Sequence, residues 1–171
     1  MIFRKFKETD TIIFFEYLQS LSHETLVFFT PNELDMGAAK RLTSNKAVND
    51  TAMINYGAFD GEIMAGYCFY KFFDKEVPIL AIGITDQYQN QGIGRELITY
   101  ALNEAKNSGK KGVRLTTFKE NFRAQHLYRS IGFIDTGDKN APEGEIELFY
   151  MFDNNTIPSF WREGVCTYEA D

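Results

Sequence analysis

The sequence predicts a mixed α/β fold in which a mostly antiparallel sheet of about six to seven strands is flanked by about four helices. Three observations lead to this prediction: strand-like runs come first and form a hairpin, later strands alternate with helical segments, and a glycine-rich turn joins a buried strand to the strongest helix. The 171 residues suit one domain with one core. We expect residues 1–152 to form that domain and residues 153–171, which have no clear period, to extend it.

The N-terminal part of the chain predicts a short strand followed by two helices. Residues 1–7 read as the strand, and Thr9 or Asp10 then caps an amphipathic helix. The inward-facing residues of this helix are expected to be Ile12, Ile13, Leu18 and Leu21. A second helix is expected over residues 33–42.

The middle of the chain predicts a hairpin and then a buried strand. Residues 51–73 contain two strand-like runs around Asp60 and Gly61, a dipeptide that suits the positive backbone angles of a tight turn. Residues 77–85, "VPILAIGIT", carry apolar side chains on both faces rather than alternately. This pattern predicts a third strand that is buried more deeply than the hairpin.

The C-terminal part predicts two helices and three strands. The strongest helix covers residues 93–106 and stops at Gly109, and its apolar residues recur at helical spacing. They are Ile93, Leu97, Ile98, Ala101, Leu102 and Ala105. A strand at residues 112–118 follows, and then a helix that Asn121 opens and Gly132 ends. Its inward-facing residues are Ala124, Leu127, Tyr128 and Ile131, and residues 133–137 and 145–152 form the closing strands.

Composition narrows the classes of partner. Apolar residues make up 44% of the chain and aromatic residues 15%, which is globular composition. The net charge of -6 disfavours nucleic acid, since phosphate backbones are bound by clustered Lys and Arg, and it leans weakly toward cationic substrates. Cys68 and Cys166 give neither a disulfide framework nor a metal-ligand spacing. We expect no metal, no membrane span, no secretory leader and a cytoplasmic location.

The loop "QYQNQGIGREL" at residues 87–97 has the features of an anion site. It lies between a buried strand and a helix, and the first turn of a helix carries unpaired N–H groups and a partial positive charge. Gly92 and Gly94 remove side chains that would keep a phosphate away from those groups. We therefore expect a pyrophosphate to bind here. On the two glycines alone, a tight turn that packs the helix closely on the sheet has equal weight.

Two other phosphate-binding loops fit poorly. A dinucleotide-binding fingerprint needs a third glycine, and Leu97 occupies that place after a hairpin rather than within a strand-helix-strand unit. A nucleoside-triphosphate loop needs Gly-Lys followed by Ser or Thr, which is missing here.

Two longer stretches resemble the central motifs of the GNAT-type N-acetyltransferase superfamily. They are "AIGITDQYQNQGIGREL" at residues 81–97 and "NFRAQHLYRSIGF" at residues 121–133. The resemblance implies a sheet with a central splay and a loop whose backbone amides bind the pyrophosphate of acetyl-CoA. It also implies that the strand backbone pairs with the pantetheine arm. The implied cofactor-binding residues are Ile82, Gly83, Ile84, Gln89, Asn90, Gln91, Gly92, Ile93, Gly94, Arg95 and Asn121.

By the same resemblance, Tyr128 matches the tyrosine that protonates the departing thiolate. The chemistry is reasonable on its own, because a thiol has a pKa near ~8.5 and a phenol near ~10, so the proton transfer is close to balanced. Helical spacing alone would make Tyr128 a core aromatic residue; the motif favours the catalytic interpretation.

The general base is not evident from the sequence. Family members often carry a glutamate where this chain has Ile79 or Thr116. An alkylammonium with a pKa near ~10.4 must still lose its proton. The nearest carboxylates in sequence are Glu76, Asp86 and Glu120, and the two histidines are His23 and His126. None of them is preferred, and a water chain would also serve.

The resemblance implies an N-acetyltransferase that moves an acetyl group from acetyl-CoA to a primary amine by direct attack. The acceptor, a small molecule or a protein amine, stays open, and a homodimer is expected by analogy alone. Because neither of the two positions that usually carry a glutamate has a carboxylate here, the alternative is a non-catalytic acyl-CoA-binding sensor or scaffold.

Overall fold

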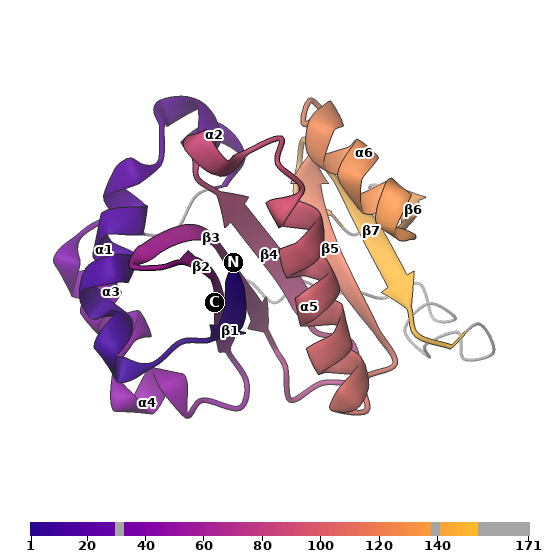
Figure 1. Cartoon of the computed structure of the whole chain (residues 1–171). Helices are drawn as coiled ribbons and strands as arrows, with labels where there is room; N and C mark the ends of the chain where they lie inside the picture. The colour runs from indigo at the N-terminus through magenta and orange to yellow at the C-terminus, as the bar shows by residue number, and fades with distance from the viewer. Residues whose placement is uncertain (30–32, 138–140, 154–171) are drawn as a thin grey trace.

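Seven strands form one sheet in the computed structural model, which describes residues 1–29, 33–137 and 141–153 (Figure 1). The strand order is β1-β2-β3-β4-β5-β7-β6, and all neighbours are antiparallel except β4 and β5. The strands are β1 (Ile2–Lys5), β2 (Ile54–Asp60), β3 (Ile63–Lys71), β4 (Ile79–Ile84), β5 (Gly112–Phe118), β6 (Ile134–Gly137) and β7 (Glu145–Met151). The predicted mixed α/β class and strand number are confirmed. Of the expected extension at residues 153–171, residues 154–171, with Cys166, lie outside the described residues.

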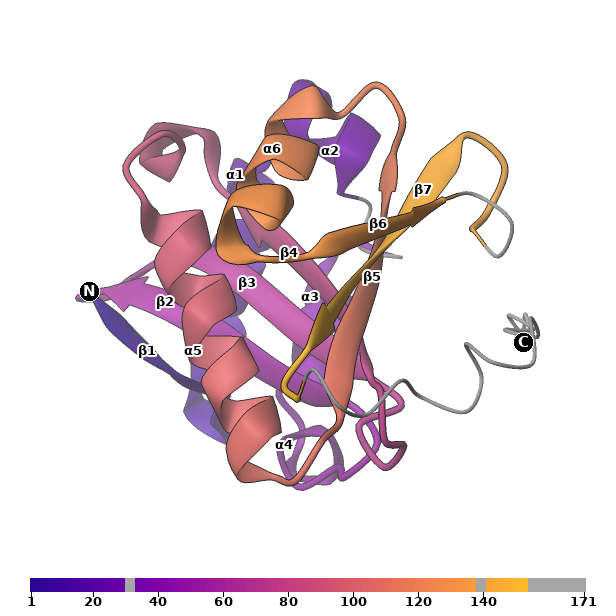
Figure 2. The same ribbon diagram turned by 90° about the vertical axis from the view of Figure 1, so that its right-hand side faces the viewer.

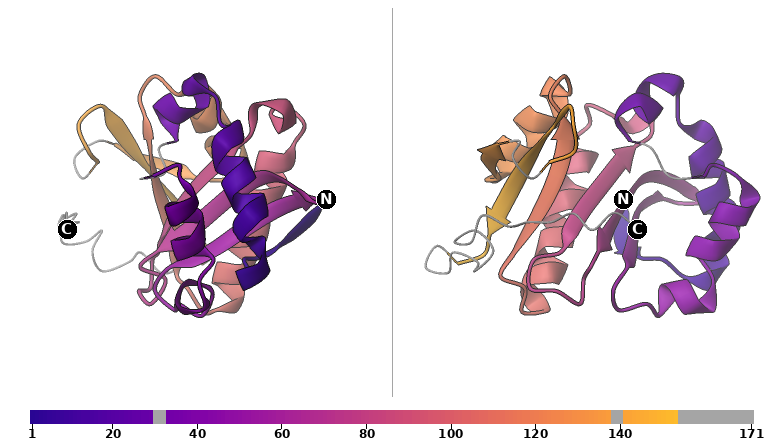
Figure 3. Two further views of the ribbon diagram at one scale, coloured as in Figure 1. Left: turned by 90° about the vertical axis from the view of Figure 1, so that its left-hand side faces the viewer. Right: turned by 180° about the vertical axis from the view of Figure 1, so that it is seen from behind.

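Helices cover both faces of the sheet (Figures 2 and 3). They are α1 (Thr11–Ser20), α2 (His23–Phe28), α3 (Met36–Leu42), α4 (Asn45–Val48), α5 (Ile93–Asn107) and α6 (Phe122–Ile131), with 3-10 turns η1 (Glu8–Asp10) and η2 (Asp86–Tyr88). α5 and α6 lie on one face, and α1 and α3 lie on the other. The short helices α2 and α4 were not predicted, although each has a serine cap: Ser22 accepts from the Thr25 N–H and Ser44 from the Ala47 N–H.

Each face of the sheet has its own apolar core. All six residues predicted to face inward from α5 are at most 7% exposed, so the helical period identified that core correctly. The other core contains Phe14, Tyr17 and Leu18 of α1. Ile12 was expected to face inward but is 57% exposed, because the covered side of α1 centres on the aromatic residues.

β4 and β5 diverge at the centre of the sheet. They are the one parallel pair, and their register contains a single position, Ile79 opposite Arg114. β4 is otherwise held by β3 along six positions, and β5 by β7 along seven. The expected central splay is therefore confirmed. It also explains why Ile82 and Ile84 are only half-buried, although the sequence predicted a strand buried on both faces.

The β2–β3 hairpin forms as predicted, with Gly61 at φ +60° in the turn. In the described part of the chain, no helix combines the length and apolar character that crossing a membrane would require.

Candidate active site

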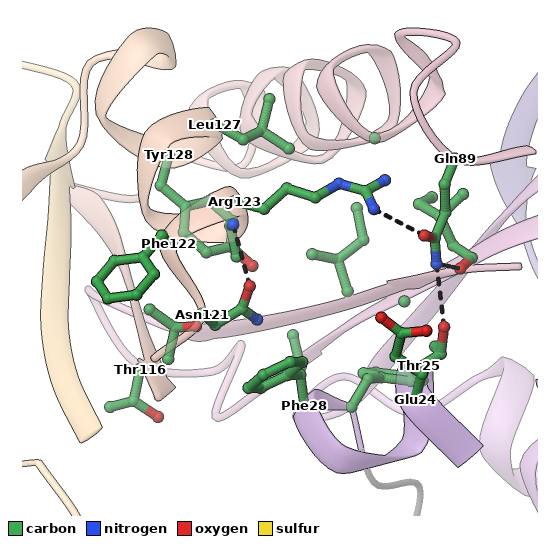
Figure 4. A pocket seen from close by; sticks show the side chains of 18 of the residues that line it. Glu24, Thr25, Phe28, Gln89, Thr116, Asn121, Phe122, Arg123, Leu127 and Tyr128 are labelled. Atoms are coloured by element: carbon green, nitrogen blue, oxygen red, sulfur yellow. Dashed lines mark hydrogen bonds between the residues drawn. The ribbon is translucent and has the colours of Figure 1, made fainter. Parts of the chain in front are cut away.

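A cavity of about 570 Å³ fills the splay between β4 and β5 (Figure 4). Its walls come from β4, β5, α2, the loop before α5 and the start of α6. Its lining residues are Glu24, Thr25, Phe28, Phe29, Leu80, Ala81, Ile82, Gly83, Ile84, Asp86, Gln89, Gly94, Thr116, Thr117, Glu120, Asn121, Phe122, Arg123, Ala124, Leu127 and Tyr128. Seven of the predicted site residues are therefore brought together: Ile82, Gly83, Ile84, Gln89, Gly94, Asn121 and Tyr128.

The edge of β4 directs peptide groups into this cavity. The Thr85 N–H donates to the Ala65 carbonyl of β3 at 3.0 Å. Since backbone groups alternate along an antiparallel pair, the N–H and C=O of Ile82 and Ile84 point toward the splay, whereas those of Gly83 point toward β3. The N–H and C=O of Ile82 and the N–H of Ile84 can thus pair with a ligand where no strand covers them, whereas the Ile84 carbonyl accepts from Gln89.

Gly83 has a packing role between them. A Cβ built on it would lie 2.4 Å from the Phe29 ring, so a side chain there would push the end of α2 off the strand. Its carbonyl also accepts a hydrogen bond from the buried Tyr17 hydroxyl at 3.1 Å. Gly83 thus lets α2 lie against β4 and form a wall of the cavity.

The N-terminus of α5 opens at the other side of the cavity. The first intrahelical bond joins the Glu96 N–H to the Gly92 carbonyl, so the N–H groups of Ile93, Gly94 and Arg95 have no carbonyl one turn back. Gly92 adopts φ +84°, which is left-handed backbone, and space around it is open. This end of the helix is positively polarised and free of a side-chain cap, as an anion site requires.

The neighbouring side chains of this loop serve other purposes. Ile93 is 7% exposed and packs in the core, so only its backbone is available to a ligand. Gln91 Nε2 donates to the Gln87 carbonyl at 2.6 Å, and Arg95 Nη2 donates to Ser130 Oγ at 2.6 Å. Together with Asn90 and Gly92, these residues form the loop but do not line the cavity.

Gln89 ties three walls of the cavity together. Its Nε2 donates to Thr25 Oγ1 at 3.0 Å and to the Ile84 carbonyl at 2.9 Å. Its Oε1 accepts from Arg123 Nη1 at 2.8 Å, so the Arg123 side chain extends from α6 across the cavity, as Figure 4 shows. The sequence motif assigned Gln89 to the ligand, whereas its side chain joins α2, β4 and α6. Arg123 was not predicted, because its reach depends on how α6 packs.

Asn121 and Tyr128 line the cavity from α6. Asn121 Oδ1 accepts from the Ala124 N–H at 3.1 Å and caps the helix, which leaves its amide nitrogen available to a ligand. Tyr128 is 7% exposed, and its ring lies 5.7 Å from the Phe133 ring. Burial raises the pKa of the Tyr128 hydroxyl above its usual value, so this phenol stays protonated at neutral pH.

Only some of the carboxylates and histidines considered as bases line the cavity. Glu76 forms an ion pair with Lys111 at 2.6 Å and does not line the cavity, and neither His23 nor His126 does. Asp86 lines it. Partial burial acts to raise the Asp86 pKa, but hydrogen bonds from Ser22 and Thr25 outweigh it and lower the pKa.

Glu120 and Glu24 also line the cavity, and both are exposed. Glu24 was not predicted because it lies on the unexpected helix α2.

A further carboxylate, Glu147, lies beside the cavity and was also missed. Glu147 is on β7, opposite Thr116 of β5, and its side chain is buried, with 5% of the residue exposed. Desolvation raises its pKa, while Arg114, 3.6 Å away, and the Thr136 hydroxyl act to lower it. Only the strand register brings Glu147 next to Thr116. In the described ranges no three His, Cys, Asp or Glu side chains gather as a metal site would require.

Comparisons with known proteins bear on the family and the fold of this chain. The model of the acetyltransferase (GNAT) family matches residues 17–133. An uncharacterized N-acetyltransferase, YvbK of Bacillus subtilis, is 29% identical over 79 residues, which is 46% of this chain and 51% of the relative. The chain thus spans about half the length of that curated relative.

Solved structures share the whole fold. A GNAT-family acetyltransferase from Streptococcus pneumoniae has a TM-score of 0.72 at 23% identity, covering 88% of this chain and 98% of that one. The ribosomal-protein-S5-alanine acetyltransferase from Vibrio fischeri has 0.77 at 15%, covering 91% and 94%. The spermidine N-acetyltransferase SpeG F149A mutant from Vibrio cholerae has 0.67 at 19%, covering 88% and 95%. With a family model matching well over half of its residues, this chain belongs to the GNAT acetyltransferase family.

Proposed function

We propose that the protein transfers an acetyl group from acetyl-CoA to a primary amine by direct attack of the amine. The observation that carries this proposal is the cavity in the splay, which joins three features that the reaction needs. They are the uncapped N-terminus of α5, the edge peptide groups of Ile82 and Ile84, and the protonated phenol of Tyr128.

The residues present fit acetyl-CoA, which supplies an activated thioester when it is bound. A Cβ on Gly94 would lie 3.4 Å from Leu127 and 3.6 Å from Ile84, so the glycine leaves that space to a ligand. The N–H groups of the first turn of α5 would hold the pyrophosphate, with Asn90, Gln91 and Arg95 shaping the loop. The peptide groups of β4 and the amide of Asn121 would hold the pantetheine arm.

The chain contributes to the acyl transfer mainly by position and by fixed dipoles. An N–H at the splayed edge of β4 can donate to the carbonyl oxygen of the acetyl group as negative charge develops on it. The Tyr128 hydroxyl donates its proton to the leaving sulfur. Holding the amine and the thioester together removes the entropic cost of their encounter, so no covalent enzyme intermediate is needed.

Deprotonation of the amine is assigned to water in the cavity and to its exposed carboxylates. An ammonium with a pKa near ~10.4 is neutral in only about one molecule in 10³ to 10⁴ at pH 7, a handicap of roughly 4 to 5 kcal/mol. Glu120 lies next to Asn121 at the mouth of the cavity and can accept the proton through water.

The remaining expectations concern the setting of the enzyme. We propose a cytoplasmic protein whose residues 1–152 form the catalytic domain, with residues 153–171 as an extension and a homodimer by analogy with related folds. The solved structures with similar folds include enzymes named for acetylating spermidine and a ribosomal-protein alanine, which are both amines.

The test combines binding and turnover. Calorimetry with acetyl-CoA should give a measurable affinity, and thiol release should appear with at least one amine from a panel. Tyr128→Phe should lower kcat by about 10²-fold with an unchanged acetyl-CoA Kd, because the hydroxyl acts in the transition state. Binding without turnover for every amine would support the sensor alternative, and no binding would refute both.

A further inference from the structure

Two exposed aromatic side chains line the cavity. Three phenylalanines of the described ranges are exposed, and two of them, Phe28 at 40% and Phe122 at 74%, line this cavity. The Phe28 ring lies 6.0 Å from the ring of Phe118 on β5. Figure 4 places Phe122 beside Thr116, at the opposite end from Gln89. Exposed rings gathered at one pocket indicate a surface that a ligand covers.

Charged side chains line the cavity beside the two rings. The Arg123 guanidinium is held by Gln89. Glu24 is on α2, one turn before Phe28, and Glu120 is next to Asn121 in the turn between β5 and α6.

That turn is fixed in place. The buried Gln125 Nε2 donates to the carbonyls of Phe118 and Lys119 at 3.0 and 2.8 Å, and the Asn121 N–H donates to the Phe118 carbonyl at 3.0 Å. Glu120, whose carbonyl accepts from the Phe122 N–H at 2.9 Å, is therefore held at a set backbone position next to Phe122.

We propose that the acceptor is a small monoamine with an aromatic body, an arylalkylamine, whose ring lies between Phe28 and Phe122. This inference rests on the proposed acetyltransferase function and names its substrate class. Two aromatic walls match a flat apolar body, and the exposed carboxylates next to them, Glu24 and Glu120, match an ammonium group, for which an aromatic face is also attractive. A polyamine offers no flat apolar body to cover the two rings, so the aromatic lining favours the arylalkylamine.

Phe122 lies on the same helix as the reacting groups. Tyr128 and Asn121 line the cavity together with Phe122, all three from α6 or its cap. An amine whose ring is held between the phenylalanines would thus have a short path to a thioester located at Tyr128. The same surface would therefore both position the amine and select its aromatic ring.

The substrate test measures thiol release from acetyl-CoA with three amines: 2-phenylethylamine, ethylamine and spermidine. Burial of the phenyl ring should make kcat/KM for phenylethylamine at least about tenfold higher than for ethylamine. It should also exceed the value for spermidine. Preference for spermidine or for ethylamine overturns the inference while leaving the acetyltransferase intact, and absence of turnover with every amine overturns both.

Two variants, each with a matched control, test which residues cause the preference for phenylethylamine. Phe28→Ala should reduce the preference for phenylethylamine over ethylamine by about tenfold and leave the KM for acetyl-CoA unchanged. Val27→Ala is the matched control, because Val27 is 50% exposed on the same helix and does not line the cavity. Glu120→Gln should raise the KM of the amine and lower kcat, whereas Glu62→Gln in the β2–β3 turn, which does not line the cavity, should change neither. Equal effects of Phe28→Ala and Val27→Ala on the preference would refute the assignment.

Discussion

Individual residues of this protein take their chemistry from their surroundings rather than from their type. Tyr128 is an ordinary phenol in sequence, but burial raises its pKa. The proton transfer to sulfur is therefore less balanced than ordinary pKa values of phenol and thiol suggest. Burial instead keeps the Tyr128 hydroxyl protonated over the pH range in which the enzyme works.

The raised pKa of Tyr128 leads to a prediction about pH. For an acid whose pKa is raised, the protonated form persists to higher pH, so loss of this proton should not limit the reaction. We expect kcat/KM to rise with pH as the amine becomes neutral and not to fall again below about pH 10. The profile should be recorded for the wild type and for Tyr128→Phe. A descending limb below that pH that disappears in the variant would contradict the assignment.

Gln89 and Asp86 illustrate a second effect at the scale of the residue. Both lie in the motif at residues 81–97, and both form hydrogen bonds with α2 or its cap: Asp86 accepts from Ser22 and Thr25, and Gln89 donates to Thr25. Their side chains therefore hold a wall of the cavity in place.

At the scale of the element, the loop and the first turn of α5 act as one unit. Asn90 at φ +61° and Gly92 at φ +84° turn the chain so that the N–H groups of the next three residues lie at the helix end. No side chain caps the helix, which would be unfavourable for stability alone. The uncapped end fits an element shaped for a bound anion.

The role of Gly92 can be separated from its backbone cost by comparison with Gly61. Both glycines have left-handed backbone, and a Cβ added to either of them would meet no atom within 4 Å. Gly92→Ala and Gly61→Ala should each lower the free energy of unfolding by about 1 kcal/mol, as judged by urea denaturation. Only Gly92→Ala should weaken acetyl-CoA binding, by about tenfold or more in calorimetry. A similar loss of affinity in Gly61→Ala would show a general effect of destabilisation.

At the scale of the whole molecule, one apolar core packs on each face of the single sheet. Leu97 of α5 and Phe14 of α1 are both fully buried, on opposite faces. β3 contributes to both cores, through Tyr70 on one face and Tyr67 on the other. The cores are therefore connected through the backbone of the sheet, and the splay is held open by elements on both faces.

Cooperative unfolding should follow from this arrangement. Leu97→Ala and Phe14→Ala should each lower the free energy of unfolding by about 3 kcal/mol, because each leaves a cavity in a packed core. Both variants should still unfold in one transition, with circular dichroism and tyrosine fluorescence coinciding. Two separate transitions in either variant would show that the faces unfold independently.

Most elements of the fold were predictable because their signals are local. The period of α5, its stop near Gly109 and the hairpin at Gly61 depend on residues a few positions apart, and all three appear in the structure. The helix α2 was missed because it is only six residues long, although Ser22 marks its start. The prediction that Ile12 faces inward was wrong, because apolar spacing alone did not identify which side of α1 the sheet would cover.

The candidate site was predictable only in part, for the same physical reason. The motif identified the residues of the loop, of β4 and of α6, and the cavity brings seven of them together. Arg123, Glu24 and Glu147 carried no recognisable signal, because their neighbours are distant in sequence. Their importance depends on helix packing and strand register.

The sequence by itself determined the family, the order of elements and the glycine geometry of the phosphate loop, since these follow from short-range backbone preferences and from a local motif. Only the tertiary structure decided which side chains of that motif face the cavity, which carboxylates reach it and which exposed aromatic residues line it. Those features arise from contacts between segments far apart in the chain, and such contacts are settled by packing of the two cores against one sheet.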